Sequence, residues 1–234
     1  MYEFPLQITS NHVTSERVLS VPWLFRIFQD AAIGDVEKIG YGTDKTLSAG
    51  LLWVFSRVYV RIHSQPKYLS HARFETHPGV KKAFLFPRYG TLYDEQGNVA
   101  AEISSIWALI REDTRALEMR PPLDSIDQTR GDEIPLPGKV VPKPVTYHGS
   151  KTIAYCDLDL NGHLNNVRYI EMLVNLKDAS FHKTHRISEM LIQYESEIRY
   201  GETVELFADA DCTYVRGVVG DRVAFEANLS YEGL

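Results

Sequence analysis

EMRPPLDSIDQTRGDEIPLPGKVVPKPV, residues 118–145, divides this chain of 234 residues. The stretch holds six of the eleven prolines in the sequence. Proline lacks an amide donor and restricts φ, so such a stretch cannot form the interior of a helix or a central strand. It predicts a proline-rich linker over 121–145, between an N-terminal domain of residues 1–120 and a C-terminal domain of residues 146–234.

The two predicted domains carry the same order of elements. In the first, residues 12–19 predict a short strand, and a helix begun by Pro22 follows it. In the second, 150–159 predict a strand and 165–179 a helix. Both helices carry one apolar face. The inward residues are Leu24, Ile27, Phe28 and Ala31 in the first helix and Val167, Ile170, Leu173 and Val174 in the second.

Long segments with a period of two follow each helix. Residues 53–62, WVFSRVYVRI, set Trp53, Phe55 and Tyr59 on one face and valines on the other, as in a half-buried strand. Further strands are predicted at 72–80, 83–94 and 99–113 in the first half and at 189–198, 203–215 and 222–232 in the second. A helix across an antiparallel sheet is an α+β arrangement, and its repetition predicts two such sheets in one chain.

Composition and charge exclude several classes of protein. Hydrophobic residues make up 44% and charged residues 24%, as in soluble globular proteins. No apolar run approaches the length that spans a bilayer, and the first thirty residues lack a secretion signal, so we expect a soluble cytoplasmic protein without a membrane partner. The net charge of −6 argues against nucleic-acid binding. Two cysteines are too few for a disulfide framework and lack zinc spacing.

The charge is unevenly distributed. Residues 51–90 contain seven basic residues and one acidic residue, Glu75. Runs of charge are usually solvated faces of strands and loops. The alternative is a docking patch that attracts an anionic partner through its local field.

The densest polar cluster is DLDLNGHLNN, residues 157–166, between a predicted strand and a predicted helix. Asp157, Asp159, Asn161 and Gly162 match the first half of a calcium-binding EF-hand loop. The match fails at the twelfth position, where a bidentate glutamate is required and Arg168 stands. An EF-hand also needs a helix before the loop, whereas the preceding segment is strand-like. We therefore expect no metal site.

The same cluster fits a catalytic loop. Asp159, Asn161 and His163 supply a carboxylate, an orienting amide and a group that titrates near neutral pH. Asn165 or Asn166 suits a helix N-cap, and amides of a first helical turn can hold an oxyanion. These groups suffice for attack by water on an acyl carbon. A polar turn with a helix cap, in which His163 has no role, is the simpler alternative.

With these residues, the chain resembles the acyl-acyl carrier protein thioesterases of the plant and bacterial type. The resemblance rests on DLDLNGHLNNVRYIE (157–171), LLWVFSRVYV (51–60), SSIWALIREDTRAL (104–117) and IQYESEI (192–198). It implies a tandem double hot-dog fold, in which an antiparallel sheet wraps a long central helix in each half. It implies hydrolysis of fatty acyl-acyl carrier protein to a free fatty acid, within fatty acid and lipid metabolism. The catalytic residues it implies are Asp159, Asn161, His163 and Glu197.

One position departs from the family pattern. The family often has a cysteine after the acidic residue, once proposed as a nucleophile, and here that residue is Ile198. Cys156 lies near the cluster, but the alternation along its segment predicts a small buried strand residue. We therefore favour a mechanism without a thiol or a cofactor, in which His163 is the general base. Direct attack by Asp159, through a mixed anhydride, remains the alternative.

The resemblance also implies that the first half holds the acyl chain and that the basic segment meets the acidic carrier protein. The expected pocket residues are Trp53, Phe55, Phe84, Phe86 and Trp107, although aromatic residues at strand spacing are more often plain core. The expected docking residues are Lys67, Arg73, Lys81, Lys82 and Arg88. Three rivals stay open: an acyl-CoA thioesterase, a hot-dog dehydratase acting on hydroxyacyl groups, and a non-catalytic protein that binds acyl chains. A homodimer is a further expectation.

Overall fold

The computed structural model describes residues 1–123 and 127–234. The chain forms two compact units. The N-terminal unit comprises Met1–Ser20 and Arg26–Pro137, and the C-terminal unit comprises Val21–Phe25 and Gly138–Leu234. Within the described ranges, no helix has both the length and the apolar character needed to cross a membrane.

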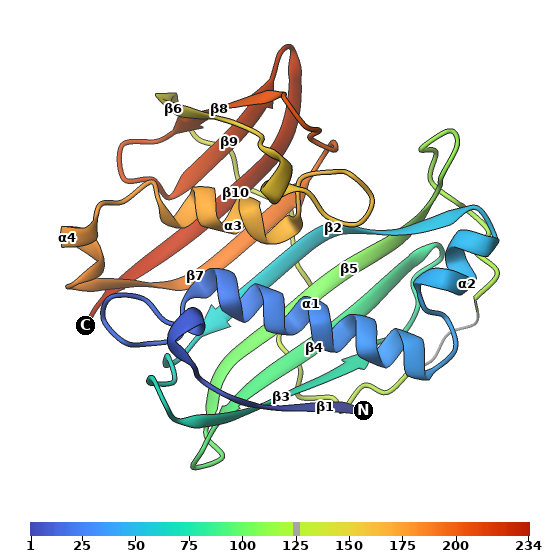
Figure 1. Ribbon diagram of the computed structural model, residues 1–234, viewed down its shortest axis with the longest axis horizontal. Coiled ribbons are helices and arrows are strands. Elements are labelled where there is room, and N and C mark those ends of the chain that lie inside the picture. Colours follow the sequence, from blue (N-terminus) through green and yellow to red (C-terminus); the bar gives the residue numbers. More distant parts are fainter. Residues whose placement is uncertain (124–126) are drawn as a thin grey trace. The chain divides into compact units, whose positions relative to one another are not determined.

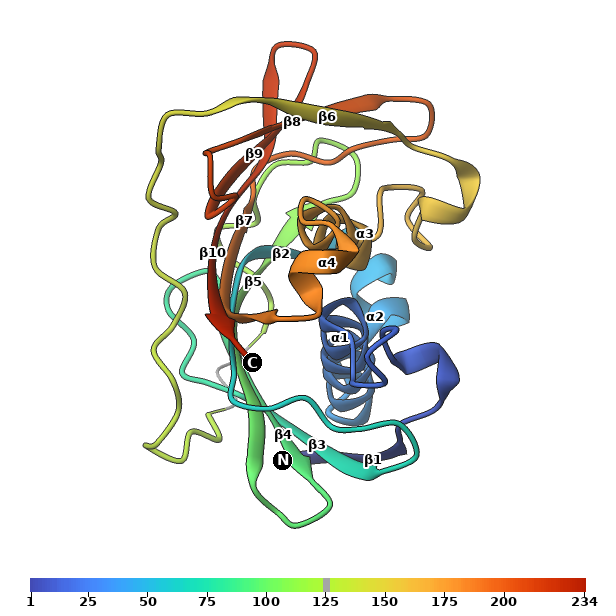
Figure 2. The same cartoon turned by 90° about the vertical axis from the view of Figure 1, so that its left-hand side faces the viewer.

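The N-terminal unit is an antiparallel sheet with helix α1 across one face (Figures 1 and 2). Its strands follow the order β1-β3-β4-β5-β2. The bounds are β1 (Tyr2–Gln7), α1 (Val21–Lys38), α2 (Thr43–Ser48), β2 (Leu51–Ile62), β3 (His71–Pro78), β4 (Leu85–Asp94) and β5 (Val99–Arg111), and a 3-10 turn, η1 (Ser10–His12), precedes α1.

Helix α1 is anchored to this sheet by Phe28, which is fully buried. The Phe28 ring centroid lies 6.1 Å from that of Phe55 on β2 and 6.0 Å from that of Phe74 on β3. Gly90 on β4 makes this approach possible, since a Cβ there would come within 2.5 Å of Phe74 and 3.1 Å of Phe28. The periodicity of the sequence predicted the inward face of this helix, and burial of such an aromatic ring stabilises the fold by a few kcal/mol, about 1.5–3.

The C-terminal unit repeats this plan. Its strand order, β6-β8-β9-β10-β7, matches that of the first unit strand for strand, and α3 lies on one face (Figures 1 and 2). The bounds are β6 (Thr146–Thr152), α3 (Asn166–Val174), α4 (Ala179–His182), β7 (His185–Tyr194), β8 (Thr203–Ala208), β9 (Tyr214–Val219) and β10 (Arg222–Gly233), and a second 3-10 turn, η2 (Tyr155–Asp157), precedes α3.

Helix α3 is held by Tyr169, which is 3% exposed. Its ring meets those of Tyr194 on β7 and Phe225 on β10 edge to face, with both centroid distances 5.2 Å. Burial raises the pKa of the Tyr169 hydroxyl far above its usual value, despite a nearby arginine and a hydrogen bond with the Ile198 backbone. Tyr169 therefore stays neutral and serves the core.

Several predicted elements needed correction. Residues 12–19 are not a strand, because His12 ends η1 and 13–19 form a turn-rich loop, and the first strand is β1. Residues 203–215 are two strands, β8 and the start of β9, separated by a turn. The predicted helix 165–179 ends at Val174. The described part of the predicted linker, 121–145, contains no helix or strand, and its residues 124–126 lie outside the described residues.

Candidate active site

The polar cluster of the sequence forms a tight loop before α3. The Asp159 amide donates to the His163 carbonyl at 2.8 Å, and the Gly162 amide donates to the Asp159 carbonyl at 3.1 Å. Gly162 has φ +76°, a value that glycine adopts without the steric cost other residues pay. The loop therefore closes on itself and presents His163 at its end.

The side chain of Asp159 organises this loop. Its Oδ1 atom accepts hydrogen bonds from the backbone amides of Asn161, at 2.9 Å, and His163, at 3.1 Å. Asn161 itself is exposed. These two bonds orient His163, which makes Asp159 part of the frame that holds the imidazole.

His163 pairs with Glu197, the acidic residue that the family resemblance implied. Nε2 of His163 lies 3.0 Å from Oε2 of Glu197, and the side chains are 12% and 28% exposed. Glu197 lies on the loop between β7 and β8, which runs beside the His163 loop because the Leu164 amide donates to the Ile198 carbonyl at 2.8 Å. A carboxylate at Nε2 favours the neutral tautomer with its proton on Nε2 and its lone pair on Nδ1. Such an imidazole can accept a proton from water.

Helix α3 begins at a predicted N-cap residue. Asn165 is the N-cap, and its Oδ1 accepts the Val167 amide at 2.9 Å. The Arg168 amide donates to the Asn165 carbonyl at 2.8 Å. Two of the helix-start amides proposed to hold an oxyanion, those of Val167 and Arg168, are therefore already bonded within the chain.

Asp157, at the start of the loop, is a second carboxylate with several hydrogen bonds. Asp157 is 8% exposed and accepts hydrogen bonds from Lys151 Nζ at 2.9 Å and the Ala154 amide at 3.0 Å. Burial alone would raise its pKa, but these bonds and the nearby Arg168 hold the pKa below the usual value. Asp157 therefore stays ionised, and the Cys156 side chain beside it is exposed rather than buried as predicted.

The structure brings four of the five predicted pocket aromatics together, in the N-terminal unit. The ring centroids of Trp53 and Phe86 are 5.0 Å apart, and those of Phe55 and Trp107 are 3.8 Å apart. Trp53 also meets Trp107, at 6.3 Å. We call Trp53, Phe55, Phe86 and Trp107 the aromatic cluster. The fifth residue, Phe84, lies in the turn before β4.

The predicted docking residues have different surroundings. Arg88 is 5% exposed and forms a buried ion pair with Asp35, with an N–O distance of 2.7 Å. A buried charge is stable only when paired, so Arg88 is a core ion pair and its assignment to docking was wrong. Arg73 is half-buried and pairs with Glu75. The docking residues that remain exposed are Lys67 and Lys82, and Lys81 donates to the Leu123 carbonyl at 2.5 Å.

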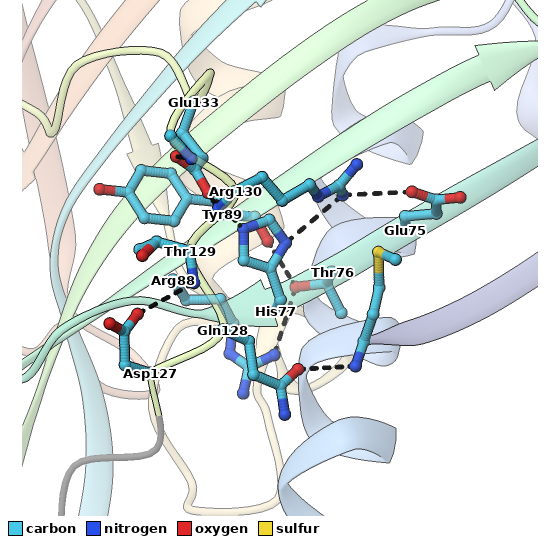
Figure 3. A network of polar contacts seen from close by, with 12 residues as sticks. Glu75, Thr76, His77, Arg88, Tyr89, Asp127, Gln128, Thr129, Arg130 and Glu133 are labelled. Atoms are coloured by element: carbon cyan, nitrogen blue, oxygen red, sulfur yellow. Dashed lines mark hydrogen bonds and ion pairs between the residues drawn. The ribbon is translucent and has the colours of Figure 1, made fainter.

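A second polar network lies in the N-terminal unit (Figure 3). His77 Nε2 lies 3.0 Å from Glu133 Oε1, and Arg130 Nη2 lies 3.1 Å from Glu75 Oε2. Burial would raise the pKa of Glu133, but backbone amides and His77 lower it to about 2. Burial is also the main reason that the pKa of His77 is lowered. The network borders an open hollow, but Glu133 already bonds His77 and Glu75 already pairs with Arg130. It anchors residues 128–134 to the sheet and has no arrangement for acyl chemistry.

Family models cover almost the whole chain. The model of the acyl-ACP thioesterase N-terminal domain matches residues 1–122, and that of the C-terminal domain matches residues 147–225. The chain belongs to the acyl-ACP thioesterase family. Solved structures agree on the fold of this family member. An acyl-ACP thioesterase from Bacteroides thetaiotaomicron aligns with a TM-score of 0.90, at 22% identity, over 98% of this chain and 97% of that one. The 12:0-ACP thioesterase from Umbellularia californica aligns with a TM-score of 0.83, at 20% identity, over 100% and 97%. The predicted tandem hot-dog fold is confirmed.

Curated relatives of this thioesterase family member are longer than it is. A dodecanoyl-[acyl-carrier-protein] hydrolase from Cinnamomum camphora is 24% identical over 81% of this chain and 54% of its own length. The oleoyl-acyl carrier protein thioesterase 2 of Arabidopsis thaliana is 22% identical over 87% of this chain and 61% of its own length. The chain therefore spans little more than half the length of these relatives.

Sequence reasoning missed three residues around the site of this family member. Asp157 was considered only as a calcium ligand, and Arg222 and Glu202 were not considered at all. Arg222 Nη2 contacts both carboxylate oxygens of Glu202, at 2.7 and 2.8 Å. No spacing links residues 20 positions apart at the ends of different strands, so only the folded chain reveals the pair.

Proposed function

We propose that the chain hydrolyses the thioester between a fatty acyl group and the phosphopantetheine of acyl carrier protein. The observation that carries this proposal is the contact of 3.0 Å between His163 Nε2 and Glu197 Oε2, beside a loop ordered by Asp159. Membership of the acyl-ACP thioesterase family supports the substrate class.

The chemistry follows from this pair. His163 Nδ1 removes a proton from water as the water oxygen attacks the thioester carbon, and Glu197 stabilises the imidazolium that forms. The Asn161 side chain is the proposed donor to the oxyanion. The C–S bond then breaks, and the imidazolium returns its proton to the thiolate. The products are a free fatty acid and the carrier with a free thiol.

The hydrogen bonds of Asp159 favour general-base catalysis by His163 over nucleophilic attack by Asp159. Its Oδ1 atom already accepts two backbone amides, which lowers the nucleophilicity of the carboxylate and restricts its movement. Rapid quenching that traps any acylated Asp159, together with hydrolysis of acyl-acyl carrier protein in H₂¹⁸O, separates the two routes. We expect ¹⁸O in the fatty acid under single-turnover conditions and none in Asp159. Label in Asp159 would indicate a mixed anhydride instead.

We propose that the aromatic cluster receives the acyl chain. The cluster is apolar, and its rings come from three strands of one sheet. Phe55 is buried, and the other three rings are partly buried. If so, Phe86→Ala should shift the preferred chain length towards longer acyl groups. Phe74→Leu in the fully buried core is the control, and it should lower stability without changing chain-length preference.

We propose that Lys67 and Lys82 contribute to carrier-protein docking, since acidic partners are attracted by exposed basic side chains. Lys67→Glu with Lys82→Glu should raise KM for acyl carrier protein several-fold at low salt and much less at high salt. An unchanged KM at low salt would show that Lys67 and Lys82 do not contribute to docking. The homodimer and the cytoplasmic location stay predictions from the sequence.

The deciding experiment is a thiol-release assay over acyl carrier proteins of several chain lengths, with the same acyl groups on CoA. We expect release from the carrier protein in the wild type and almost none in His163→Ala. Preferential release from CoA would favour the acyl-CoA thioesterase, and binding without release would favour the non-catalytic protein.

A further inference from the structure

The loop that carries Glu197 is held by one arginine from another strand. Arg222 is the first residue of β10, and its Nη1 donates to Ser196 Oγ at 2.7 Å and to the Glu197 carbonyl at 2.5 Å. Its Nη2 forms the bidentate pair with Glu202 at 2.7 and 2.8 Å. One guanidinium therefore bonds three residues of this loop: Ser196, Glu197 and, at the end of the loop, Glu202.

The ion pair closes the loop. Glu202 Oε2 also accepts the Arg199 amide at 2.6 Å, so its carboxylate joins Arg222 to the backbone beyond Glu197. Hydrogen bonds from Arg222 and Arg199 hold the pKa of Glu202 below its usual value, although burial acts the other way. At the near end, the amides of Glu195 and Ser196 donate to the Ala224 carbonyl, at 2.9 and 3.1 Å.

The N-terminal unit has the same loop without this pair. There the amides of His63 and Ser64 donate to the Ala100 carbonyl, at 2.8 and 3.0 Å, as Glu195 and Ser196 do to Ala224. The residue two positions before Ala100 is Asn98, which contacts Asp94 in its own turn. The residue at the place of Glu202 is Ser70, whose hydroxyl donates to the Lys67 carbonyl. In the part of the chain that the structure describes, the Arg222–Glu202 pair therefore occurs in the half that has the His163–Glu197 pair.

We infer that Arg222, through its ion pair with Glu202 and its bond to the Glu197 carbonyl, is a positioning residue that keeps the Glu197 carboxylate against His163. Arg222 acts on Glu197 through the Glu197 backbone carbonyl and through the side chains of Ser196 and Glu202 in the same loop. The pair is partly open to solvent, at 39% for Arg222 and 32% for Glu202, so salt should weaken it. This inference rests on the proposed function for its kinetic readout only.

The test compares Arg222→Gln, Glu202→Gln and Glu197→Gln with a matched control. The control is Arg216→Gln, because Arg216 on β9 is 38% exposed and pairs with Glu226 at 3.1 Å, outside the Glu197 loop. Displacing a catalytic group by about 1 Å can cost up to 10²-fold in rate. We therefore expect Arg222→Gln to lower kcat roughly 10- to 100-fold, with little change in KM, and Arg216→Gln to leave both within about twofold.

Two readouts separate positioning from a merely structural role. In Arg222→Gln, the acidic limb of the kcat/KM profile should move in the same direction as in Glu197→Gln. The double variant Arg222→Gln/Glu197→Gln should be no slower than Glu197→Gln alone, because the two changes act on one interaction. A lower melting temperature with unchanged kcat and an unchanged pH profile would overturn the inference, and so would independent, multiplying losses in the double variant.

A further measurement does not depend on activity. The Nε2 proton of His163 should give a downfield NMR resonance in the wild type and in Arg216→Gln. That resonance should be lost or shifted in Arg222→Gln and in Glu197→Gln. If the wild type hydrolyses no thioester, the proposed function fails but this resonance still tests the positioning. If Arg222→Gln is active and keeps the resonance, the positioning fails and the proposed function stands.

Discussion

The loop before α1 in the N-terminal unit and the loop before α3 in the C-terminal unit have the same backbone hydrogen bonds. In the first, the Thr14 amide donates to the Val18 carbonyl at 2.9 Å, and in the second, the Asp159 amide donates to the His163 carbonyl at 2.8 Å. Three further amide-to-carbonyl bonds of the N-terminal loop have a counterpart in the C-terminal loop. The Arg17–Thr14 bond corresponds to Gly162–Asp159, the Ser20–His12 bond to Asn165–Asp157, and the Leu19–Pro66 bond to Leu164–Ile198.

Four side chains on these equal frames differ. Thr14, Glu16 and Val18 occupy the places of Asp159, Asn161 and His163. Gln65, before Pro66, takes the place of Glu197 and donates to the Leu19 carbonyl at 2.7 Å. The fold therefore builds the loop in both halves from backbone bonds, and four side chains make one copy suitable for acid–base chemistry. A polar turn of this kind does not by itself imply catalysis.

The largest expected effect on kcat comes from replacing His163 by valine, the residue at the equivalent position, Val18, of the N-terminal loop. His163→Val should lower kcat roughly 10²- to 10⁴-fold, because the general base is lost while the loop keeps its backbone bonds. Thioester hydrolysis and thermal unfolding measure the two effects separately. Val18→His is the matched control and should leave kcat unchanged. A folded His163→Val variant with normal turnover would refute the assignment.

Glu197→Gln gives the C-terminal unit the residue type that the N-terminal unit has at the equivalent position, Gln65. The amide keeps the size of the side chain but cannot stabilise an imidazolium as a carboxylate does. We expect kcat to fall roughly 10- to 100-fold, by about 1.4–2.8 kcal/mol in the activation barrier. The pH profile of kcat/KM measures the change, since its acidic limb should move. An unaltered limb with normal kcat would mean that Glu197 takes no part.

Glu133→Gln tests the polar network that is found in the N-terminal unit. With a pKa of about 2 in the folded state, below its ordinary value, ionised Glu133 stabilises the fold above about pH 4.5. This stabilisation is lost as the pH falls towards 2. The variant should therefore be less stable than the wild type by about 1–3 kcal/mol at pH 7, and the difference should shrink in acid. Denaturant unfolding at several pH values measures it, and a difference independent of pH would contradict the ionised role.

The smallest effect concerns the turn residues of the two loops. Gly162 has φ +76° and the equivalent Arg17 has φ +62°, so only one loop has the residue that this conformation favours. Gly162→Ala should destabilise the protein by about 1 kcal/mol, and Arg17→Gly should have a smaller effect of opposite sign. Thermal unfolding of both variants provides the comparison. Equal destabilisation by both changes would show that the loops are less alike than their hydrogen bonds indicate.

Much of the fold could be predicted from local pattern. The alternating segment 53–62 lies within β2, and the alternating segment 99–113 covers β5. The inward face of α1 includes Phe28, as predicted. Residues 12–19 form a loop instead of the predicted strand, because the amides of Thr14 and Arg17 bond carbonyls within the same segment. The turn between β8 and β9 escaped notice because it contains no glycine. There the carboxylate of Asp209 accepts the amides of Thr213 and Tyr214, and Cys212 takes φ +55°.

The sequence by itself determined the two-part plan, the helix-facing residues and the identity of the polar cluster around His163, since these depend on periodicity and on residue type within one segment. Only the tertiary structure decided what each charge does. Arg88 and Arg222 are residues of the same type, and nothing in the sequence distinguishes their roles. In the structure, Arg88 is buried against Asp35, whereas Arg222 pairs with Glu202 in the loop that carries Glu197. The physical reason is that the energy of a charge depends on its partners and its burial, and both come from segments far apart in the chain.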